Sequence, residues 1–342
     1  MSIVSLGKTG LVLEKNGFGA LPVQRVSVQD AVAILRRAYD GGIRLFDTAR
    51  YYTDSEQKIG RAFQKMRDKV VIASKTMALN AADFERDLNT SLKELGTDWI
   101  DIYQFHNPPF MPEPGDGTGL YEAMLKAKSD GKIRHISITS HRCHVAEKAI
   151  RSGLYDTLQY PFSYICGSHE HELVRLCAEH NVGFIAMKAM AGGLIRNSRA
   201  AAAYIGQFDN VLPIWGVQKM SELEEFLSYV GNTPEMDEEL ERIIANDKKM
   251  MAGEFCRACG YCLPCPAEID IPQCARMSLM LRRAPAQNFL TPHWQSEMAK
   301  IDNCINCGSC KSKCPYQLDT PALLKRNLDD YRDVLNKKVS VI

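Results

Sequence analysis

The feature that most constrains the fold is an alternation, between about Gly17 and Gly231, of eight short apolar runs with stretches of helical periodicity. Such stretches, Val28–Tyr39 and Ala81–Leu95 among them, space apolar residues as one face of a helix does. Eight β-then-α units predict a closed parallel (β/α)8 barrel, because closure leaves no sheet edge unpaired. The predicted strands are Phe18–Val23, Ile43–Ala49, Val70–Thr76, Trp99–His106, Ile133–Ser140, Thr157–Ser163, Val182–Lys188 and Val211–Val217.

An open doubly wound sheet is the alternative to the barrel, but its glycine-rich first turn is absent from residues 17–21. Before the first strand, Ile3–Leu6 and Leu11–Leu13 flank a turn and predict a hairpin that plugs the N-terminal mouth of the barrel. Glycines between helices and strands predict left-handed helix ends. These are Gly41, Gly42, Gly96, Gly131, Gly153 and Gly183.

Beyond Gly231 the character of the sequence changes. An acidic helix is predicted over Glu235–Lys249, and the rest is cysteine-rich with two helix-like stretches, Ile271–Arg283 and Thr320–Leu335. We therefore predict two domains, the barrel over residues 1–235 and a smaller, mainly helical domain over residues 236–342.

Four polar residues close or follow three successive predicted strands. Asp47 lies near the end of the second strand and Tyr52 just after it. Lys75 lies near the end of the third strand, and His106 ends the fourth. In a barrel these strand ends share one mouth, where chemistry takes place. A lysine next to a tyrosine stabilises the phenolate, and a carboxylate keeps that lysine charged. An imidazole can hydrogen-bond a carbonyl oxygen. The set predicts carbonyl reduction, with Tyr52 as proton donor.

The segments around these residues resemble the aldo-keto reductase superfamily. The matching motifs are Asp47-Thr48-Ala49-x-x-Tyr52-x-x-Ser55-Glu56, Ser74-Lys75-Thr76 and Phe105-His106-Asn107-Pro108, and the resemblance covers about residues 1–230. It implies a barrel, a nicotinamide cofactor bound without a Rossmann fold, and reversible reduction of an aldehyde or ketone. It also implies a set of cofactor-binding positions, namely Gly19, Ala20, Thr139, Ser140, Gln159, Met187, Gly192, Gly193 and Lys219.

Two of these positions depart from the family pattern. Ser140 stands where the family more often has Asn, and Met187 where it usually stacks an aromatic ring on nicotinamide. At the expected ribose segment, Lys219 is the one cation and Glu222 follows it, so the sequence leaves NADP and NAD as alternatives. His141 and His144 are interpreted as solvated loop residues.

Nine of the 12 cysteines lie between Cys256 and Cys314. Two blocks, each ending in Cys-Pro, have a spacing that is typical of [4Fe–4S] ligation in bacterial ferredoxins, although the first block is one residue short. Zinc ribbons are the competing interpretation. We expect the fourth cysteine of each block to complete the other cluster. The predicted ligand sets are Cys256, Cys259, Cys262 and Cys314 for one cluster, and Cys304, Cys307, Cys310 and Cys265 for the other.

Cys274, within the same region, is expected to be a free thiol, and Cys143, Cys166 and Cys177 are expected to be buried or idle thiols. The sequence does not decide whether the clusters transfer electrons or hold the domain together, because metal–thiolate bonds can fold a small domain.

The net charge of +1 and the lack of a long apolar run argue against nucleic-acid and membrane partners. A cytoplasmic enzyme is expected, with a small carbonyl or alcohol substrate and with a redox carrier as a further candidate partner. The alternative function is an electron-transfer protein, in which the clusters pass electrons between nicotinamide and a ferredoxin or flavin partner.

Overall fold

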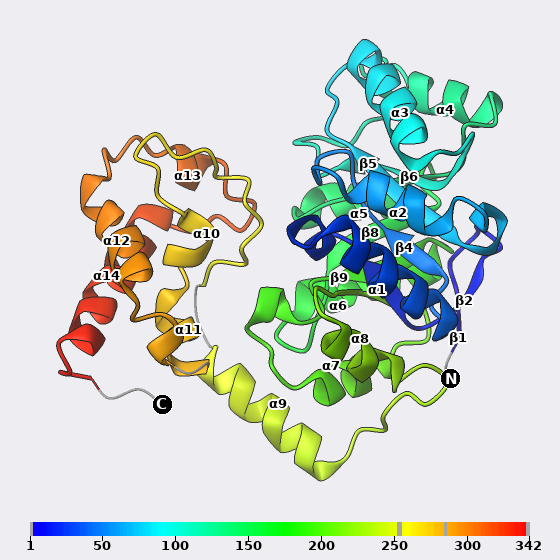
Figure 1. Ribbon diagram of the computed structural model, residues 1–342. Coiled ribbons are helices and arrows are strands. Elements are labelled where there is room, and N and C mark those ends of the chain that lie inside the picture. The colour runs from blue at the N-terminus through cyan, green and yellow to red at the C-terminus, as the bar shows by residue number, and fades with distance from the viewer. Residues whose placement is uncertain (1–2, 252–254, 284–285, 340–342) are drawn as a thin grey trace. The chain divides into compact units, whose positions relative to one another are not determined.

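The computed structural model describes residues 3–251, 255–283 and 286–339. Its contacts divide the chain into two units. The first contains the residues up to Ala189 together with Asn197–Ile243, and the second contains Met190–Arg196 and the residues from Ile244 onward. Figure 1 shows the elements of both units, which are described separately below.

The first unit is built on a closed barrel of eight parallel strands, in the order β10-β3-β4-β5-β6-β7-β8-β9. The predicted barrel is therefore confirmed. The strands are β3 (Gly17–Gly19), β4 (Leu45–Asp47), β5 (Val71–Thr76), β6 (Ile100–His106), β7 (Ile133–Thr139), β8 (Thr157–Pro161), β9 (Gly183–Met187) and β10 (Val211–Gly216).

Helices follow the strands, and α3 (Ala81–Leu95) shows why they form. Its buried residues recur at helical spacing, the Asn80 side chain accepts a hydrogen bond from the Asp83 amide, and Gly96 ends it with a φ of +63°. The other helices of the unit are α1 (Val28–Asp40), α2 (Ser55–Phe63), α4 (Leu120–Ser129), α5 (Cys143–Ser152), α6 (Ser168–Glu179), α7 (Ser198–Gly206) and α8 (Met220–Leu227), with short 3-10 turns at Pro22–Arg25 and Arg67–Lys69.

Several local predictions in this unit are wrong. Gly41 ends α1 with a φ of −80°, and the positive φ, of +103°, lies at Gly42 instead. His141, interpreted as a solvated loop residue, is 4% exposed. The first strand ends at Gly19 rather than Val23, because Pro22, which has no amide hydrogen, begins a 3-10 turn. Gly183 is the first residue of β9 and does not end a helix. The residue with a positive φ after the preceding helix is Asn181, at +52°. A side chain at Gly183 would collide with Leu6, whose nearest atom lies 2.6 Å from the position of a Cβ.

An N-terminal hairpin, β1 (Ile3–Ser5) and β2 (Val12–Glu14), forms as predicted. It packs into the barrel at the start of the strands. Its buried side chains Val4, Leu6 and Leu13 share one apolar cluster with inward-facing residues such as Leu45 and Leu212. The bottom of the barrel is therefore apolar and filled, which leaves the opposite mouth for polar groups.

The second unit is helical and has its own core. Its elements are α10 (Ile271–Cys274), α11 (Met277–Arg283), α12 (Pro292–Ala299), α13 (Ser309–Ser312) and α14 (Thr320–Leu335), with 3-10 turns at Ala191–Gly193, Ala286–Asn288 and Lys300–Asn303. The helix α9 (Glu238–Met250) is divided between the two units, and its residues from Ile244 onward belong to the second. The core includes Cys274, Leu281, Met298, Leu324 and Tyr331.

The helix predicted over residues 271–283 is broken in two. Asn327 of α14 replaces the missing helical hydrogen bonds, since its amide nitrogen donates to the Ala275 carbonyl at 3.2 Å and its oxygen accepts from the Ser278 amide at 2.8 Å. A contact between helices therefore stabilises the break.

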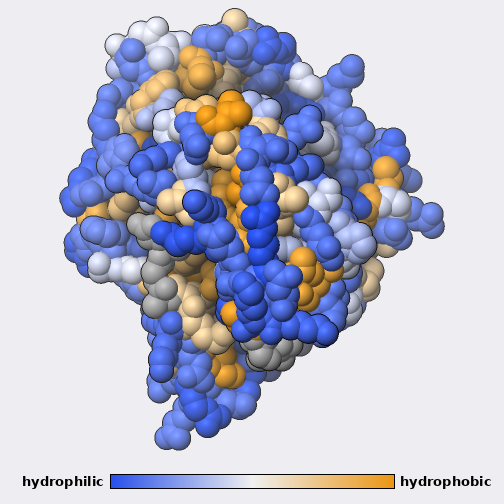
Figure 2. All heavy atoms as spheres, turned by 90° about the vertical axis from the view of Figure 1, so that its left-hand side faces the viewer, coloured by the Kyte–Doolittle hydropathy of each residue, from blue (hydrophilic) through white to orange (hydrophobic). Residues whose placement is uncertain are grey.

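Hydrophilic residues dominate the face shown in Figure 2, and apolar residues are scattered among them. Scattered apolar residues are usual on protein surfaces. Within the described parts of the chain, no helix combines the length and apolar character needed to span a membrane.

Candidate active site and iron–sulfur sites

Polar side chains occupy the inner positions of β4, β5 and β6 above the apolar layer. In the strand register, Asp47 of β4 lies beside Ala73 of β5, which precedes Lys75 by two residues. Lys75 in turn lies beside Gln104 of β6. Inward-facing positions alternate along each strand, so Lys75 follows Ala73 and Gln104 follows Ile102 on the inner wall. The strand register therefore brings these side chains together at one end of the barrel.

Asp47 and Lys75 form a buried ion pair. The Lys75 Nζ lies 2.6 and 2.8 Å from the two carboxylate oxygens of Asp47 and 2.6 Å from the Thr48 carbonyl oxygen. The exposed fractions of the two residues are 2% and 1%. Burial raises the pKa of Asp47 and lowers the pKa of Lys75, and the charge of each partner opposes that shift.

Tyr52 lies beside this ion pair on a short loop that backbone hydrogen bonds hold in place. The Thr48 amide bonds to the Ala73 carbonyl at 2.8 Å, and the Tyr52 amide to the Ala49 carbonyl at 2.9 Å. The Lys75 Nζ is 5.3 Å from the centre of the Tyr52 ring, and that ring meets the His106 ring edge-on at 5.8 Å. All four predicted catalytic side chains therefore lie together.

A second buried carboxylate supports the loop. Glu56, which is 1% exposed, accepts a hydrogen bond from the Ser74 hydroxyl at 2.5 Å and pairs with Arg50, whose own amide donates to the Lys75 carbonyl at 3.0 Å. Burial raises the pKa of Glu56. Glu56 belongs to the quoted motif, but the sequence analysis assigned it no role.

His106 is neutral at physiological pH. Burial, together with the nearby charge of Lys75, lowers its pKa to about 3. Its Nδ1 is buried without a hydrogen-bond partner among the described residues. The chain turns directly after it, because Asn107 has a φ of +53° and its side-chain oxygen accepts from the His141 amide at 2.9 Å. Neutral imidazole can donate a hydrogen bond without carrying charge.

Three predicted cofactor positions lie on the strands around the same mouth. Thr139 pairs with both His106 and Gln159, and its hydroxyl is 3.9 Å from the Met187 sulfur. Gln159 is 2% exposed and contacts Asp47, with 3.3 Å between its Nε2 and the Asp47 Oδ1. These three side chains lie beside the four catalytic candidates.

Other predicted cofactor positions are arranged differently. The Ser140 hydroxyl is engaged in a local turn with the backbone of Arg142, at 3.0 and 3.1 Å. Gly19 ends β3 close to the Trp215 carbonyl oxygen, which lies 3.2 Å from the position of a Cβ. The Ala20 amide donates to the Asp47 carbonyl at 2.8 Å. Gly19 and Ala20 therefore provide close backbone packing beside Asp47.

Gly192 and Gly193 lie in the segment Met190–Arg196, which belongs by its contacts to the second unit. Within that unit the Arg276 guanidinium donates to the Gly192 carbonyl at 2.7 Å. A Cβ on Gly192 would meet the same guanidinium at 3.2 Å. The cofactor-binding role of these two glycines therefore stays a prediction.

Lys219 is exposed immediately before α8. The Glu222 carboxylate turns back over the start of this helix and accepts from the Gln218 and Lys219 amides at 2.8 and 3.0 Å. These two donors at the helix N-terminus are therefore already satisfied by a negative charge.

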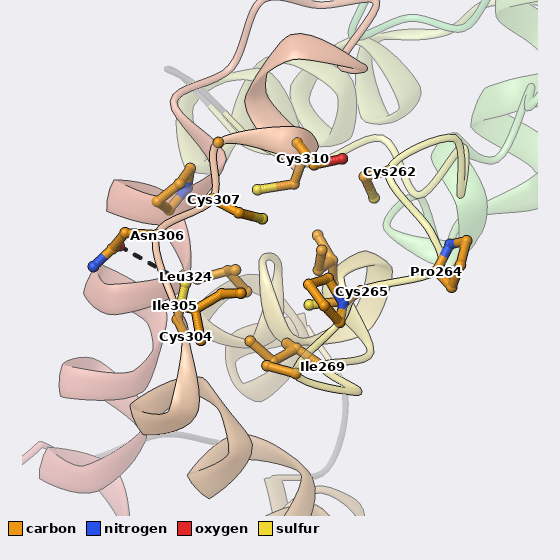
Figure 3. A pocket seen from close by; sticks show the side chains of 16 residues that line it. Cys262, Pro264, Cys265, Ile269, Cys304, Ile305, Asn306, Cys307, Cys310 and Leu324 are labelled. Atoms are coloured by element: carbon orange, nitrogen blue, oxygen red, sulfur yellow. Dashed lines mark hydrogen bonds between the residues drawn. The ribbon is translucent and has the colours of Figure 1, made fainter.

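The cysteines of the second unit line two pockets. Figure 3 shows the first, where Cys304, Cys307 and Cys310 come from one block and Cys265 from the other, with Cys262 at the edge. The second pocket is lined by Cys256, Cys259, Cys262 and Cys314, and Cys310 lines it as well. Each predicted ligand set, including its exchanged fourth cysteine, thus lines one pocket.

The other cysteines lie elsewhere. Cys274 is fully buried, and its thiol points to the Glu297 carbonyl oxygen at 3.8 Å. Cys166 and Cys177 are buried within the barrel unit, and Cys143 is half-buried. In the described residues, no three Cys, His, Asp or Glu side chains are close enough to hold a single metal ion.

The aldo/keto reductase family model matches residues 15–211, which is more than half of the chain. The chain belongs to the aldo/keto reductase family. Residues 255–319 match a 4Fe–4S dicluster domain, so this aldo/keto reductase carries an iron–sulfur domain at its C-terminal end. The two matches together support an oxidoreductase.

Individual relatives are distant. L-galactose dehydrogenase of Arabidopsis thaliana is 34% identical over 150 residues, which cover 40% of this chain and 47% of that protein. Aldo-keto reductase YhdN of Bacillus subtilis is 26% identical over 57% of this chain and 64% of its own length. The chain thus spans less than two thirds of either relative.

A solved structure shows the same fold. An aldo-keto reductase from Klebsiella pneumoniae, in complex with NADPH, superposes with a TM-score of 0.63 at 21% identity. The superposition covers 72% of this chain and 94% of that one.

Sequence reasoning missed Gln104 in this aldo/keto reductase. Gln104 is fully buried and contacts both Asp47 and Gln159. One signal was present: Gln104 stands two residues before His106 in a strand that is otherwise mainly apolar, and therefore faces the same side as His106.

Proposed function

We propose that this aldo/keto reductase reversibly reduces an aldehyde or ketone to an alcohol, with a nicotinamide dinucleotide as cofactor. The observation that carries the proposal is the placement of Lys75, which is bonded to Asp47 at 2.6 Å and lies 5.3 Å from the ring of Tyr52. His106 faces the same ring. A charged amine, a phenol and a neutral imidazole together suit proton transfer to a carbonyl oxygen.

Each side chain has a separate task in this proposal. Tyr52 gives its proton to the carbonyl oxygen, and the charge of Lys75 stabilises the phenolate that remains. Asp47 keeps Lys75 charged and oriented within the barrel. His106, neutral because of its low pKa, donates a hydrogen bond that orients the carbonyl oxygen. When bound, the reduced dinucleotide supplies the hydride.

The residues at the mouth fit a nicotinamide ring. Gln159 and Thr139 provide amide and hydroxyl groups for the carboxamide, and the thioether of Met187 offers an apolar surface to the ring face. A panel of aldehydes and ketones, assayed by the absorbance of NADH and NADPH after anaerobic purification, tests the proposal. Turnover of none of them, by a chain with its full iron content, would contradict it.

The Glu222 carboxylate is expected to favour NADH over NADPH. If the adenosine ribose lies at the start of α8, as the family resemblance implies, a 2′-phosphate there would face this negative charge. Glu222→Gln keeps an acceptor for the two amides and removes the charge. We expect the ratio of the NADPH and NADH dissociation constants to shift about tenfold toward NADPH.

Titration calorimetry with both dinucleotides measures this ratio. Glu224→Gln is the matched control, because Glu224 lies on the same helix but pairs with Arg37 on the surface. An unchanged ratio in Glu222→Gln, or an equal shift in the control, would show that Glu222 does not select the cofactor.

We propose that the C-terminal domain holds two [4Fe–4S] clusters, one in each cysteine-lined pocket. Thiolate is the ligand that such clusters require, and each pocket presents four predicted ligands. Cys314→Ser is expected to remove about half of the bound iron and sulfide, because a [4Fe–4S] cluster needs four ligands. Cys274→Ser, at a buried cysteine outside both pockets, is expected to retain all of it.

Iron and sulfide are measured on anaerobically purified protein. Full iron in Cys314→Ser would refute that ligand, whereas equal losses in both variants would point to general instability. The dicluster domain also supports a second candidate function, electron transfer between nicotinamide and a ferredoxin or flavin partner. Anaerobic bleaching of the visible absorbance by NADH would favour this second function.

A further inference from the structure

A polar network at the centre of the barrel includes Gln104, which the proposed reaction leaves without a task. Gln104 is 0% exposed. Its amide nitrogen donates to Asp47 Oδ2 at 3.1 Å and to Gln159 Oε1 at 2.8 Å, and its oxygen accepts from the Ser137 hydroxyl at 3.2 Å. Gln104 therefore joins the carboxylate that holds Lys75 to the amide of Gln159.

The carboxylate of Asp47 determines which atoms of this network donate hydrogen bonds and which accept them. Lys75 donates to both carboxylate oxygens of Asp47, so both of these oxygens are acceptors. The Gln104 atom next to Asp47 must then be its amide nitrogen, since an amide oxygen would repel the carboxylate. The second hydrogen of that nitrogen points to Gln159, which must present its oxygen in return.

The orientation of the Gln159 amide is fixed in the same way. Its oxygen is engaged by Gln104, and one hydrogen of its nitrogen is directed at Asp47 Oδ1, 3.3 Å away. In the part of the chain that the structure describes, the second N–H of Gln159 has no acceptor, so this donor remains for a ligand. The strand register places Gln159 directly beside Thr139, and Thr139 beside His106.

We propose that Gln104 is a positioning residue, which holds the Gln159 amide so that its free N–H donates to the carboxamide oxygen of nicotinamide. This rests on the proposed function, because it assumes a nicotinamide ring at this mouth. The carboxylate of Asp47 sets the orientation of both amides, so the charge that holds Lys75 also determines how the cofactor is recognised.

Three ligands test the proposal by dissociation constants alone: NAD+, its thionicotinamide analogue and ADP-ribose. Sulfur is a weak acceptor, so the unaltered chain should bind the thio analogue about five- to tenfold more weakly than NAD+, the value of one hydrogen bond. In Gln104→Met the Gln159 amide loses the shorter of its two orienting contacts and keeps only the 3.3 Å contact with Asp47 Oδ1, so this difference should fall to about twofold or less. ADP-ribose lacks the nicotinamide ring, and its affinity should not change.

Two further variants make the test independent of how well Gln104→Met folds. Ser137→Ala removes the donor at the other end of Gln104 but leaves Asp47 in place. It should therefore retain the difference in affinity between NAD+ and its thionicotinamide analogue, called the oxygen–sulfur difference below. Asp47→Asn leaves Gln104 intact but removes the acceptor-only group, so it should lose the difference.

The outcomes separate the two proposals. An oxygen–sulfur difference that persists in Gln104→Met or in Asp47→Asn overturns the role of Gln104, as does its absence in the unaltered chain. A parallel loss of ADP-ribose affinity in Gln104→Met would show a distorted barrel and also overturn that role. Failure of the unaltered chain to bind any of the three ligands overturns the proposed function itself.

Discussion

Replacing Tyr52 with Phe is expected to lower the rate of carbonyl reduction by about 10²- to 10⁴-fold, the contribution usual for general acid catalysis. The variant removes one hydroxyl from a ring that lies near both the Lys75 amine and the His106 ring. The dissociation constant for the dinucleotide should stay unchanged, because the cofactor contacts proposed here involve Gln159 and Thr139. Single-turnover kinetics with bound reduced cofactor measure the chemical step directly.

The neighbouring tyrosine provides the matched control. Tyr51 is 72% exposed, and Tyr51→Phe removes the same hydroxyl one residue away, so it should keep nearly full activity. Normal turnover in Tyr52→Phe would remove Tyr52 from the mechanism. Equal losses in both variants would indicate damage to the loop rather than the loss of a proton donor.

The second large effect is expected on stability. Lys75→Met should lower the free energy of unfolding by about 3–5 kcal/mol, because it leaves a buried carboxylate without its partner. Asp47 is 2% exposed and its remaining contacts, from Gln104 and Gln159, are neutral amides. Urea unfolding monitored by far-ultraviolet circular dichroism measures the change.

The pH dependence of this loss has a definite sign. Without Lys75, burial should raise the pKa of Asp47 further above the value in the unfolded chain, so the folded state binds the extra proton. Stability of Lys75→Met should therefore fall as pH rises above about 4, the pKa of an aspartate in the unfolded chain, toward the raised pKa of the folded state. The double variant Asp47→Asn with Lys75→Met carries no buried charge here and should recover most of the loss. No recovery would show that the ion pair is not the cause.

Much of the fold could be predicted because the barrel repeats one local pattern. Each strand is a short apolar run, and each helix has its own apolar face and end signals, as Asn80 and Gly96 show for α3. Two predictions failed because a residue far away in the sequence decides the local structure. Gly183 packs against Leu6 of the hairpin, and Asn327 of α14 stabilises the break in the helix predicted over residues 271–283.

The candidate site was predictable for a similar reason. Asp47 and His106 each end a strand, Lys75 stands one residue before the end of its strand, and parallel strands bring their ends to one mouth. Gln104 and Glu56 could not be assigned roles in the same way. The role of a buried amide or carboxylate depends on the side chain opposite to it, which no local pattern specifies.

The amino-acid sequence alone predicted the barrel, the chemical types at its mouth and the eight cysteines that line the two pockets, because spacing along the chain is enough to predict strands, helices and groups of cysteines. Tertiary structure alone decided which way the amide of Gln159 faces, how Glu56 holds the loop before Tyr52 and to which unit Gly192 belongs. These features depend on hydrogen bonds between residues far apart in sequence, and the direction of such a bond exists only once both partners are in place.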